Sequence, residues 1–169
     1  MSVWLPWSGR GGRTAGPHTD RQSLLMSEVR PAIAADAAAL ATLSGQLGYP
    51  LDEATARERF AAIEDDPRHA VLVAEDEGGA VVGWIHIMPK IMLLVSDVCE
   101  IGGLVVDESH RSRGVGRALV AAAEAWARRS GYQELTVRSD TRRVAAHGFY
   151  PALGFVAAKE QKVYKKALG

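Results

Sequence analysis

The chain has 169 residues, of which 47% are hydrophobic and 24% charged, a composition typical of one globular domain with its own core. Its single cysteine, Cys99, excludes an internal disulfide and a cysteine-only metal site, and no two histidines have metal-ligand spacing, so we expect no metal. No apolar run is long enough for a membrane span or a signal peptide. We therefore expect a cytoplasmic protein that does not bind membranes.

The 20 basic and 20 acidic residues balance overall, but they are unevenly placed. Residues 31–108 hold 4 basic and 14 acidic residues, whereas residues 109–169 hold 12 basic and 4 acidic ones. This division suits an enzyme that joins a cationic substrate to an anionic cofactor. The alternative is ordinary solvated surface charge. Nucleic-acid binding is not expected, because no aromatic residues are interleaved with the basic ones.

The first 25 residues are rich in Gly, Arg, Pro and Ser, which predicts a poorly ordered tail ahead of a domain over residues 26–169. Met26 directly precedes the first regular segment, and we expect it to be the natural initiator. The alternative is that Trp4 and Trp7 dock in a groove, as exposed aromatic residues often do at interfaces.

The spacing of apolar residues predicts one domain with the element order β-αα-βββ-α-β-α-ββ. This order is typical of an α/β domain with a mixed central sheet flanked by helices. The elements expected in chain order are a strand over 29–33, helices capped by Asp36 and Asp52, strands over 69–74, 80–88 and 97–106, a helix over 114–129, a strand over 134–138, a helix over 142–153, and a closing hairpin of strands 155–159 and 162–166.

A glycine- and arginine-rich motif joins the strand ending at residue 106 to the next helix. Its glycines, Gly114 and Gly116, let backbone N–H groups converge, and the helix N-terminus adds unpaired donors. The neighbouring arginines supply forked donors for phosphate oxygens. The third glycine of the dinucleotide fingerprint and the Gly-Lys-Ser/Thr of the NTPase loop are both missing. The motif predicts a diphosphate-binding turn, and a purely structural turn is the alternative.

This motif, Arg111-x-x-Gly114-x-Gly116, and the segment FYPALGF over residues 149–155 resemble the GNAT superfamily of N-acetyltransferases. The resemblance covers residues 28–168 and implies acetyl-CoA as cosubstrate. It implies that the loop binds the pyrophosphate and that the preceding strand pairs with the pantetheine arm. The Gly102–Gly103 pair would then mark a bulge where the neighbouring strand splays away. The residues so assigned to acetyl-CoA are Leu104, Val105, Val106, Arg111, Arg113, Gly114, Val115, Gly116 and Arg117.

One position departs from the family pattern. Relatives often carry an asparagine where this chain has Arg143. Either that contact is lost, or Arg143, together with Arg142 and Arg138, reaches the CoA phosphates. We expect the second outcome.

The resemblance also implies catalytic residues. Tyr150 occupies the position of a tyrosine that protonates the departing thiolate, and a phenol with a pKa of roughly 10 stays protonated at neutral pH. Glu100 lies in the register of a family glutamate that acts as the base, although it could instead bind the substrate cation. A backbone N–H near Val105 is the expected oxyanion donor. Trp84, His86 and Met88 share one face of a strand and could line the acceptor cleft or pack in the core.

The function predicted is therefore acetyl-CoA-dependent N-acetylation of a primary amine, by direct transfer in a ternary complex. The acceptor expected is a small cationic metabolite or an antibiotic-like amine. The alternatives are a protein lysine or N-terminal acetyltransferase and a catalytically silent acyl-CoA-binding module, which would have no need of Tyr150 or Glu100. A homodimer is a family-level expectation only.

Overall fold

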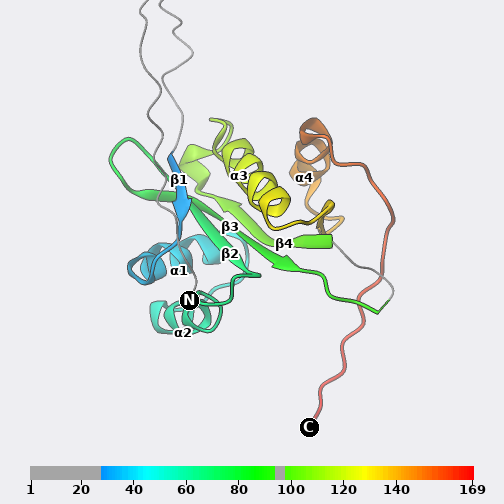
Figure 1. Ribbon diagram of the computed structural model, residues 1–169. Helices are drawn as coiled ribbons and strands as arrows, with labels where there is room; N and C mark the ends of the chain where they lie inside the picture. Colours follow the sequence, from blue (N-terminus) through cyan, green and yellow to red (C-terminus); the bar gives the residue numbers. More distant parts are fainter. Residues whose placement is uncertain (1–27, 94–97) are drawn as a thin grey trace, which may run out of the picture.

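The structure, a computed structural model, describes residues 28–93 and 98–169. The expectations for the N-terminal tail and for Met26 lie outside these residues. Helices α1 and α2 lie on one side of a central sheet and α3 and α4 on the other (Figure 1). The strands are β1 (Glu28–Pro31), β2 (Ala70–Glu75), β3 (Val81–Pro89), β4 (Val98–Val106) and β5 (Glu134–Val137). The helices are α1 (Ala37–Gln46), α2 (Glu53–Ala61), α3 (Val115–Arg129) and α4 (Val144–Phe149), with short 3₁₀ turns η1 (Ala34–Asp36), η2 (Glu108–His110) and η3 (Pro151–Leu153).

The sheet has the order β1-β2-β3-β4-β5, with antiparallel pairing up to β4 and parallel pairing between β4 and β5. The predicted mixed sheet is therefore confirmed, as is the element order up to α4. Helix α3 crosses over between the two parallel strands and packs on β2, β3 and β4. None of the helices in the described part of the chain is long and apolar enough to cross a membrane.

The predicted closing hairpin is wrong: residues 155–169 contain no strand. Two strands over 155–159 and 162–166 would be joined by Glu160-Gln161, and a two-residue hairpin loop needs positive φ angles that favour Gly or Asn. Two of the apolar residues in this segment, Val163 and Tyr164, are 79% and 85% exposed. The segment therefore does not bury the apolar surface that would hold a hairpin against the sheet.

The main core lies between α3 and the sheet. Val115 and Leu119 of α3 are buried as predicted, whereas Ala122 and Trp126 lie at the edge of this core and are only partly buried. The sequence prediction omitted three further buried residues of α3, namely Val120, Ala123 and Ala127. The opposite face of the sheet carries a smaller cluster formed by Leu40, Phe60 and Val73, with Trp84 packed against it.

The two predicted helix caps have different outcomes. Asp52 caps α2 as expected, because its carboxylate accepts a hydrogen bond from the Thr55 backbone N–H at 2.7 Å. The predicted side-chain cap by Asp36 is wrong. Its carboxylate instead pairs with Arg30 at 2.8 Å and accepts the Ile33 N–H at 2.8 Å, because η1 precedes α1 and turns this side chain back toward β1.

The predicted bulge in β4 is confirmed. His86 pairs with Gly103 and the next residue, Ile87, pairs with Ile101, so Gly102 has no partner on β3. Gly103 is required by close packing, because a Cβ atom at this position would lie 2.7 Å from the Trp84 ring. Strand β5 pairs with β4 only as far as Ile101. The two parallel strands therefore separate at the bulge.

Candidate active site

The loop between β4 and α3 has the backbone geometry expected of an anion-binding turn. Gly114 precedes the first residue of α3 with φ of +87°, a left-handed conformation that favours glycine. Beyond its chain neighbours and the helix's own backbone, no atom of the described residues would lie within 4 Å of a Cβ atom at this position, so the space in front of the helix N-terminus is open. The first N–H groups of α3 face this space without intrahelical partners. A phosphate group therefore fits the turn both sterically and electrostatically.

Gly116 allows close packing of two helices, whereas Gly114 provides the left-handed turn before α3. A Cβ atom on Gly116 would lie 3.1 Å from the Phe149 ring and 3.6 Å from the Val106 side chain. The glycine thus lets the end of α4 pack against the first turn of α3. The next residue after Phe149 is Tyr150, so this contact fixes the predicted proton donor relative to the loop.

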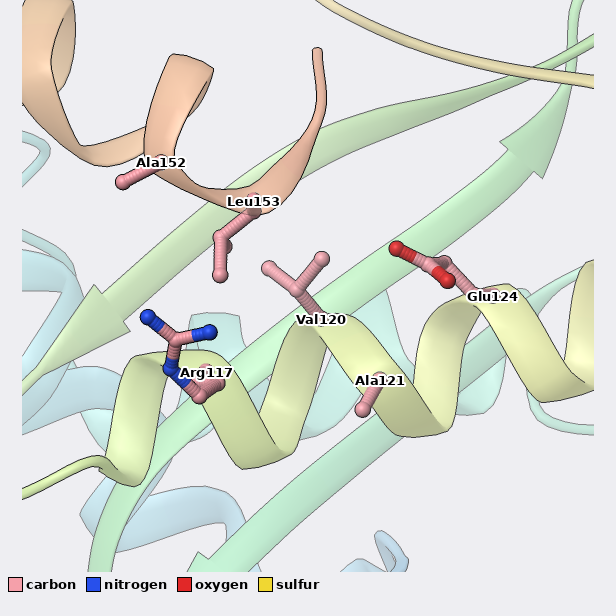
Figure 2. A pocket seen from close by; sticks show the side chains of 6 residues that line it. All are labelled: Arg117, Val120, Ala121, Glu124, Ala152 and Leu153. Carbon is pink, nitrogen blue, oxygen red and sulfur yellow. The ribbon is translucent and has the colours of Figure 1, made fainter.

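The arginines of the loop lie at its rim and are exposed to solvent. Arg111 donates a hydrogen bond to the Val106 carbonyl at 3.2 Å and approaches Glu108 at 3.6 Å. Arg117 lies one turn into α3, at a surface depression of ≈ 360 Å³ between α3 and η3. Figure 2 shows its guanidinium beside Leu153, with Val120 and Glu124 further along α3.

The backbone of Leu104–Val106 borders the gap that opens where β5 ends. These residues pair with β3 on one side, but β5 has no residue opposite them on the other. Unpaired backbone groups on a strand edge can bind an extended chain that carries amide groups. The edge therefore has the geometry that the resemblance requires for the pantetheine arm.

Tyr150 lies at the C-terminal end of α4 and is half-buried. Its ring makes edge-to-face contacts with Phe149 and Phe155, at centroid distances of 5.1 and 5.4 Å. Burial raises the pKa of the phenol, and the nearby Arg143 guanidinium opposes this shift. The hydroxyl therefore keeps its proton at neutral pH. The packing contacts and the donor role are compatible, because the first involves the ring and the second the hydroxyl.

Glu100 is 4% exposed and both of its carboxylate oxygens pair with cations. Arg138, just beyond β5, donates a hydrogen bond from Nε to Oε1 at 2.8 Å, and its Nη2 forms an ion pair with the same oxygen at 2.7 Å. Lys90, just beyond β3, approaches Oε2 at 3.4 Å. The Arg138 contact is tighter than the Lys90 contact, because two guanidinium nitrogens lie close to Oε1 and only the more distant ammonium group lies near Oε2. Glu100 is thus a buried carboxylate in which one oxygen is tightly paired with Arg138 and the other has only the looser contact with Lys90.

The arginines expected at the CoA phosphates have other partners in the structure. Arg138 pairs with Glu100, and Arg142 pairs with Asp140 at 2.7 Å. Arg143 donates from Nη2 to the Leu47 carbonyl at the end of α1, at 2.6 Å. The Arg138 contact follows from the parallel register, since Thr136 lies opposite Glu100 and Arg138 is two residues further on the same face.

Two histidines, one of them at the bulge, form a contact that the sequence analysis did not predict. Nδ1 of His69, which precedes β2, lies 3.1 Å from Nε2 of His86 on β3. Burial lowers the pKa of His86 to about 4, and His69 adds to the shift, so the His86 ring is neutral. Beside them, the buried indole Nε1 of Trp84 makes no hydrogen bond with the residues that the structure describes.

Comparisons with known proteins agree with this geometry. Residues 37–155 match the acetyltransferase (GNAT) family. An aminoglycoside N(6')-acetyltransferase type 1 of Stenotrophomonas maltophilia is 34% identical over 131 residues, which cover 75% of this chain and 84% of that protein. The N-acetyltransferase family 8 member 3 of Rattus norvegicus is 29% identical over 114 residues, 63% of this chain and 50% of that one.

Solved structures show the same fold. The aminoglycoside 6'-N-acetyltransferase of Acinetobacter baumannii superposes with a TM-score of 0.74 at 18% identity, over 85% of this chain and 100% of that one. An aminoglycoside N-acetyltransferase in complex with CoA gives a TM-score of 0.75 at 20% identity, over 85% and 97% of the two chains. The family match supports acetyl-CoA as the cosubstrate. The chain belongs to the acetyltransferase (GNAT) family and is an acyltransferase that acetylates amines.

Proposed function

We propose that this enzyme acetylates a primary amine of a small polycationic compound of the aminoglycoside type, by direct transfer from acetyl-CoA in a ternary complex. The observation that carries the proposal is Glu100, a buried carboxylate that pairs with the ammonium group of Lys90. A site that already accommodates one ammonium group is chemically suited to another. The acidic segment over residues 31–108 attracts a polycation, and two curated relatives are named as aminoglycoside N(6')-acetyltransferases.

In this proposal acetyl-CoA lies along the gap between β4 and β5. Its amide groups pair with the free edge of Leu104–Val106, and its pyrophosphate lies in front of Gly114, where Arg111 and Arg113 neutralise charge. The depression beside Arg117 is the place proposed for the adenosine end, since its wall combines a guanidinium with apolar side chains, and its one carboxylate, on Glu124, pairs with Arg128. This placement of acetyl-CoA is supported by the direction of β4, whose free edge leads to the loop that contains Gly114.

The proposed role of Glu100 is to bind the charge of the acceptor. Lys90 is a flexible side chain on one oxygen, so an ammonium group of the substrate can replace it without disturbing the Arg138 pair. An acceptor with several amines then keeps one charged at Glu100 while a second, neutral amine reaches the thioester. This role favours polyamines over compounds with a single amine.

Tyr150 supplies the proton that completes the transfer. The amine nitrogen attacks the thioester carbonyl carbon, the backbone N–H near Val105 stabilises the oxyanion, and the C–S bond breaks. Protonation of the thiolate by the Tyr150 hydroxyl makes the leaving group stable. The raised pKa of this hydroxyl supports the assignment, because it keeps the donor protonated before the reaction.

The test is a mass-spectrometric screen of amines with acetyl-CoA, followed by two variants. With an aminoglycoside that carries a 6'-amine, Glu100→Gln should raise KM for the acceptor about tenfold or more and leave KM for acetyl-CoA unchanged. Lys90→Met removes the competing ammonium and should lower the acceptor KM. A fall in kcat of Glu100→Gln confined to the acidic limb of the pH profile, with KM unchanged, would make Glu100 the base instead. Acetylation of peptide lysines alone would contradict the substrate class.

A further inference from the structure

The pair formed by His69 and His86 lies on the same face of the sheet as Glu100. Met88 of β3 stands directly opposite Glu100 of β4, so their side chains project to the same side. His86 precedes Met88 by two residues and therefore shares that face. The ring of His86 also reaches the bulge, because a Cβ atom on Gly102 would lie 3.5 Å from its Nδ1.

The hydrogen bond between the two imidazoles defines their roles. His86 has one nitrogen, Nδ1, directed at Gly102 and the other, Nε2, within 3.1 Å of His69 Nδ1. The two ring planes differ by only 27°, so an in-plane N–H of one ring can point at a lone pair of the other. When His86 donates from Nε2, its Nδ1 lone pair is free and faces the exposed glycine.

We propose that His86 and His69 form a proton relay that removes the proton from the acceptor amine during acetyl transfer. The inference rests on the proposed function, in which acetyl-CoA lies along the Leu104–Val106 edge that directly follows the bulge. Glu100, whose two oxygens are engaged by Arg138 and Lys90, then binds charge and does not act as the base.

The proton balance of the relay is simple. As the C–N bond forms, the nitrogen becomes positively charged and gives one proton to His86 Nδ1. The Nε2–H of His86 moves to His69 Nδ1, and His69 releases its other proton to water from its partly exposed ring. The Tyr150 hydroxyl protonates the departing sulfur and then regains a proton from water, which balances the proton released by His69. The products are the amide and CoA with a free thiol.

The low basicity of His86 is compatible with this step. Burial keeps the ring neutral, so it is ready to accept a proton at any pH above about 4. The nitrogen of the tetrahedral intermediate is far more acidic than the free ammonium, so a weak base suffices. Transfer onward to His69 means that the buried ring need not hold the charge.

The experiment compares variants that separate proton transfer from packing. His69→Asn retains an oxygen that can accept the His86 N–H, but it cannot take up a proton. His86→Gln retains a donor toward His69 but has no base at the position of Nδ1. His110→Asn is the matched control, because His110 contacts Asp107 and Ser109 outside this pair.

The readout is the single-turnover rate with an aminoglycoside that carries a 6'-amine, with acetyl-CoA affinity measured by calorimetry. Loss of a general base predicts a rate about 100-fold lower in His69→Asn and His86→Gln, with unchanged acetyl-CoA affinity and an unchanged rate in the control. His69→Ala should lose a similar factor and recover at least tenfold with millimolar imidazole. A normal rate in folded His69→Asn, or the lack of imidazole rescue, would overturn the relay.

The relay and the proposed substrate class can fail separately. If the wild-type enzyme acetylates a peptide lysine and no small amine, the substrate class is wrong and the same variants are compared on that peptide. If small amines are acetylated at equal rates by the wild type and the His69 variants, the substrate class holds and the relay is wrong. Should His86→Gln not fold, the two His69 variants still decide.

Discussion

Gly114 provides a direct test of the anion-binding loop, because two nearly isosteric substitutions separate charge from backbone strain. Gly114→Asp and Gly114→Asn both place a side chain in the left-handed conformation, at a cost of roughly 1–2 kcal/mol in the free energy of unfolding. Neither side chain meets a neighbouring atom at Cβ, since nothing lies within 4 Å. The two variants therefore share their strain and differ by one negative charge.

The expected effect of that charge on CoA binding follows from Coulomb's law. A carboxylate at roughly 6 Å from each of two phosphate charges, in the dielectric of water, is repelled by about 0.7 kcal/mol per pair, or about 1.4 kcal/mol in total. This energy corresponds to a tenfold weaker Kd. Lower effective dielectric at the protein surface increases the difference. Gly114→Asp should therefore bind CoA at least ten times more weakly than Gly114→Asn.

Stability should change in the opposite direction. A carboxylate at the N-terminus of α3 is stabilised by the helix dipole and by the arginines of the loop, by about 0.3–1 kcal/mol. Gly114→Asp should thus melt at a higher temperature than Gly114→Asn while binding CoA less tightly, and the difference in affinity should shrink at 1 M salt. Calorimetry and thermal melting measure both quantities. Equal CoA affinity of the two folded variants would refute the placement of the pyrophosphate at this loop.

Two further predictions concern catalysis and stability. Tyr150→Phe keeps the ring contacts with Phe149 and Phe155, so acetyl-CoA affinity should be unchanged while the rate of the chemical step falls 100-fold or more; an unaltered single-turnover rate would leave Tyr150 with a packing role only. Asp36→Asn removes a charged partner of Arg30 and should lower the free energy of unfolding by about 1.5–3 kcal/mol at pH 7. Because Arg30 lowers the pKa of Asp36, this contribution is present above the unfolded pKa near 4 and is lost as the pH falls below it. In urea titrations of both proteins, the difference in the free energy of unfolding should therefore be smaller at pH 3 than at pH 7, and a constant difference would contradict the ion pair.

The features that sequence reasoning predicted well are those with a local physical cause. Gly102 and Gly103 weaken a strand unless a bulge requires them, and the bulge is present. Asp52 caps α2 because its carboxylate needs only the backbone three residues away. The loop at Gly114 follows from the change between strand and helix periodicity and from the freedom of glycine.

The features that were missed depend on long-range pairing. The partners of Glu100 come from the ends of β3 and β5, and only the register of the assembled sheet brings them together. The His69–His86 contact likewise depends on how β2 and β3 align. The closing hairpin was predicted from the spacing of apolar residues, although the segment has no residue suited to the turn between its strands. In each case the local sequence shows which residue types are present but does not show which distant residues they contact.

The separation of β4 from β5 also bears on how the protein behaves before it meets its cosubstrate. A strand edge with unpaired N–H and C=O groups is a template on which another chain can add, and it invites self-association. A ligand that pairs with this edge masks it, and ligand present at a hundred times its Kd adds about 2.7 kcal/mol to the folded state. The cosubstrate would thus also act as a solubilising and stabilising ligand, and preparations stripped of it are the ones most exposed to aggregation.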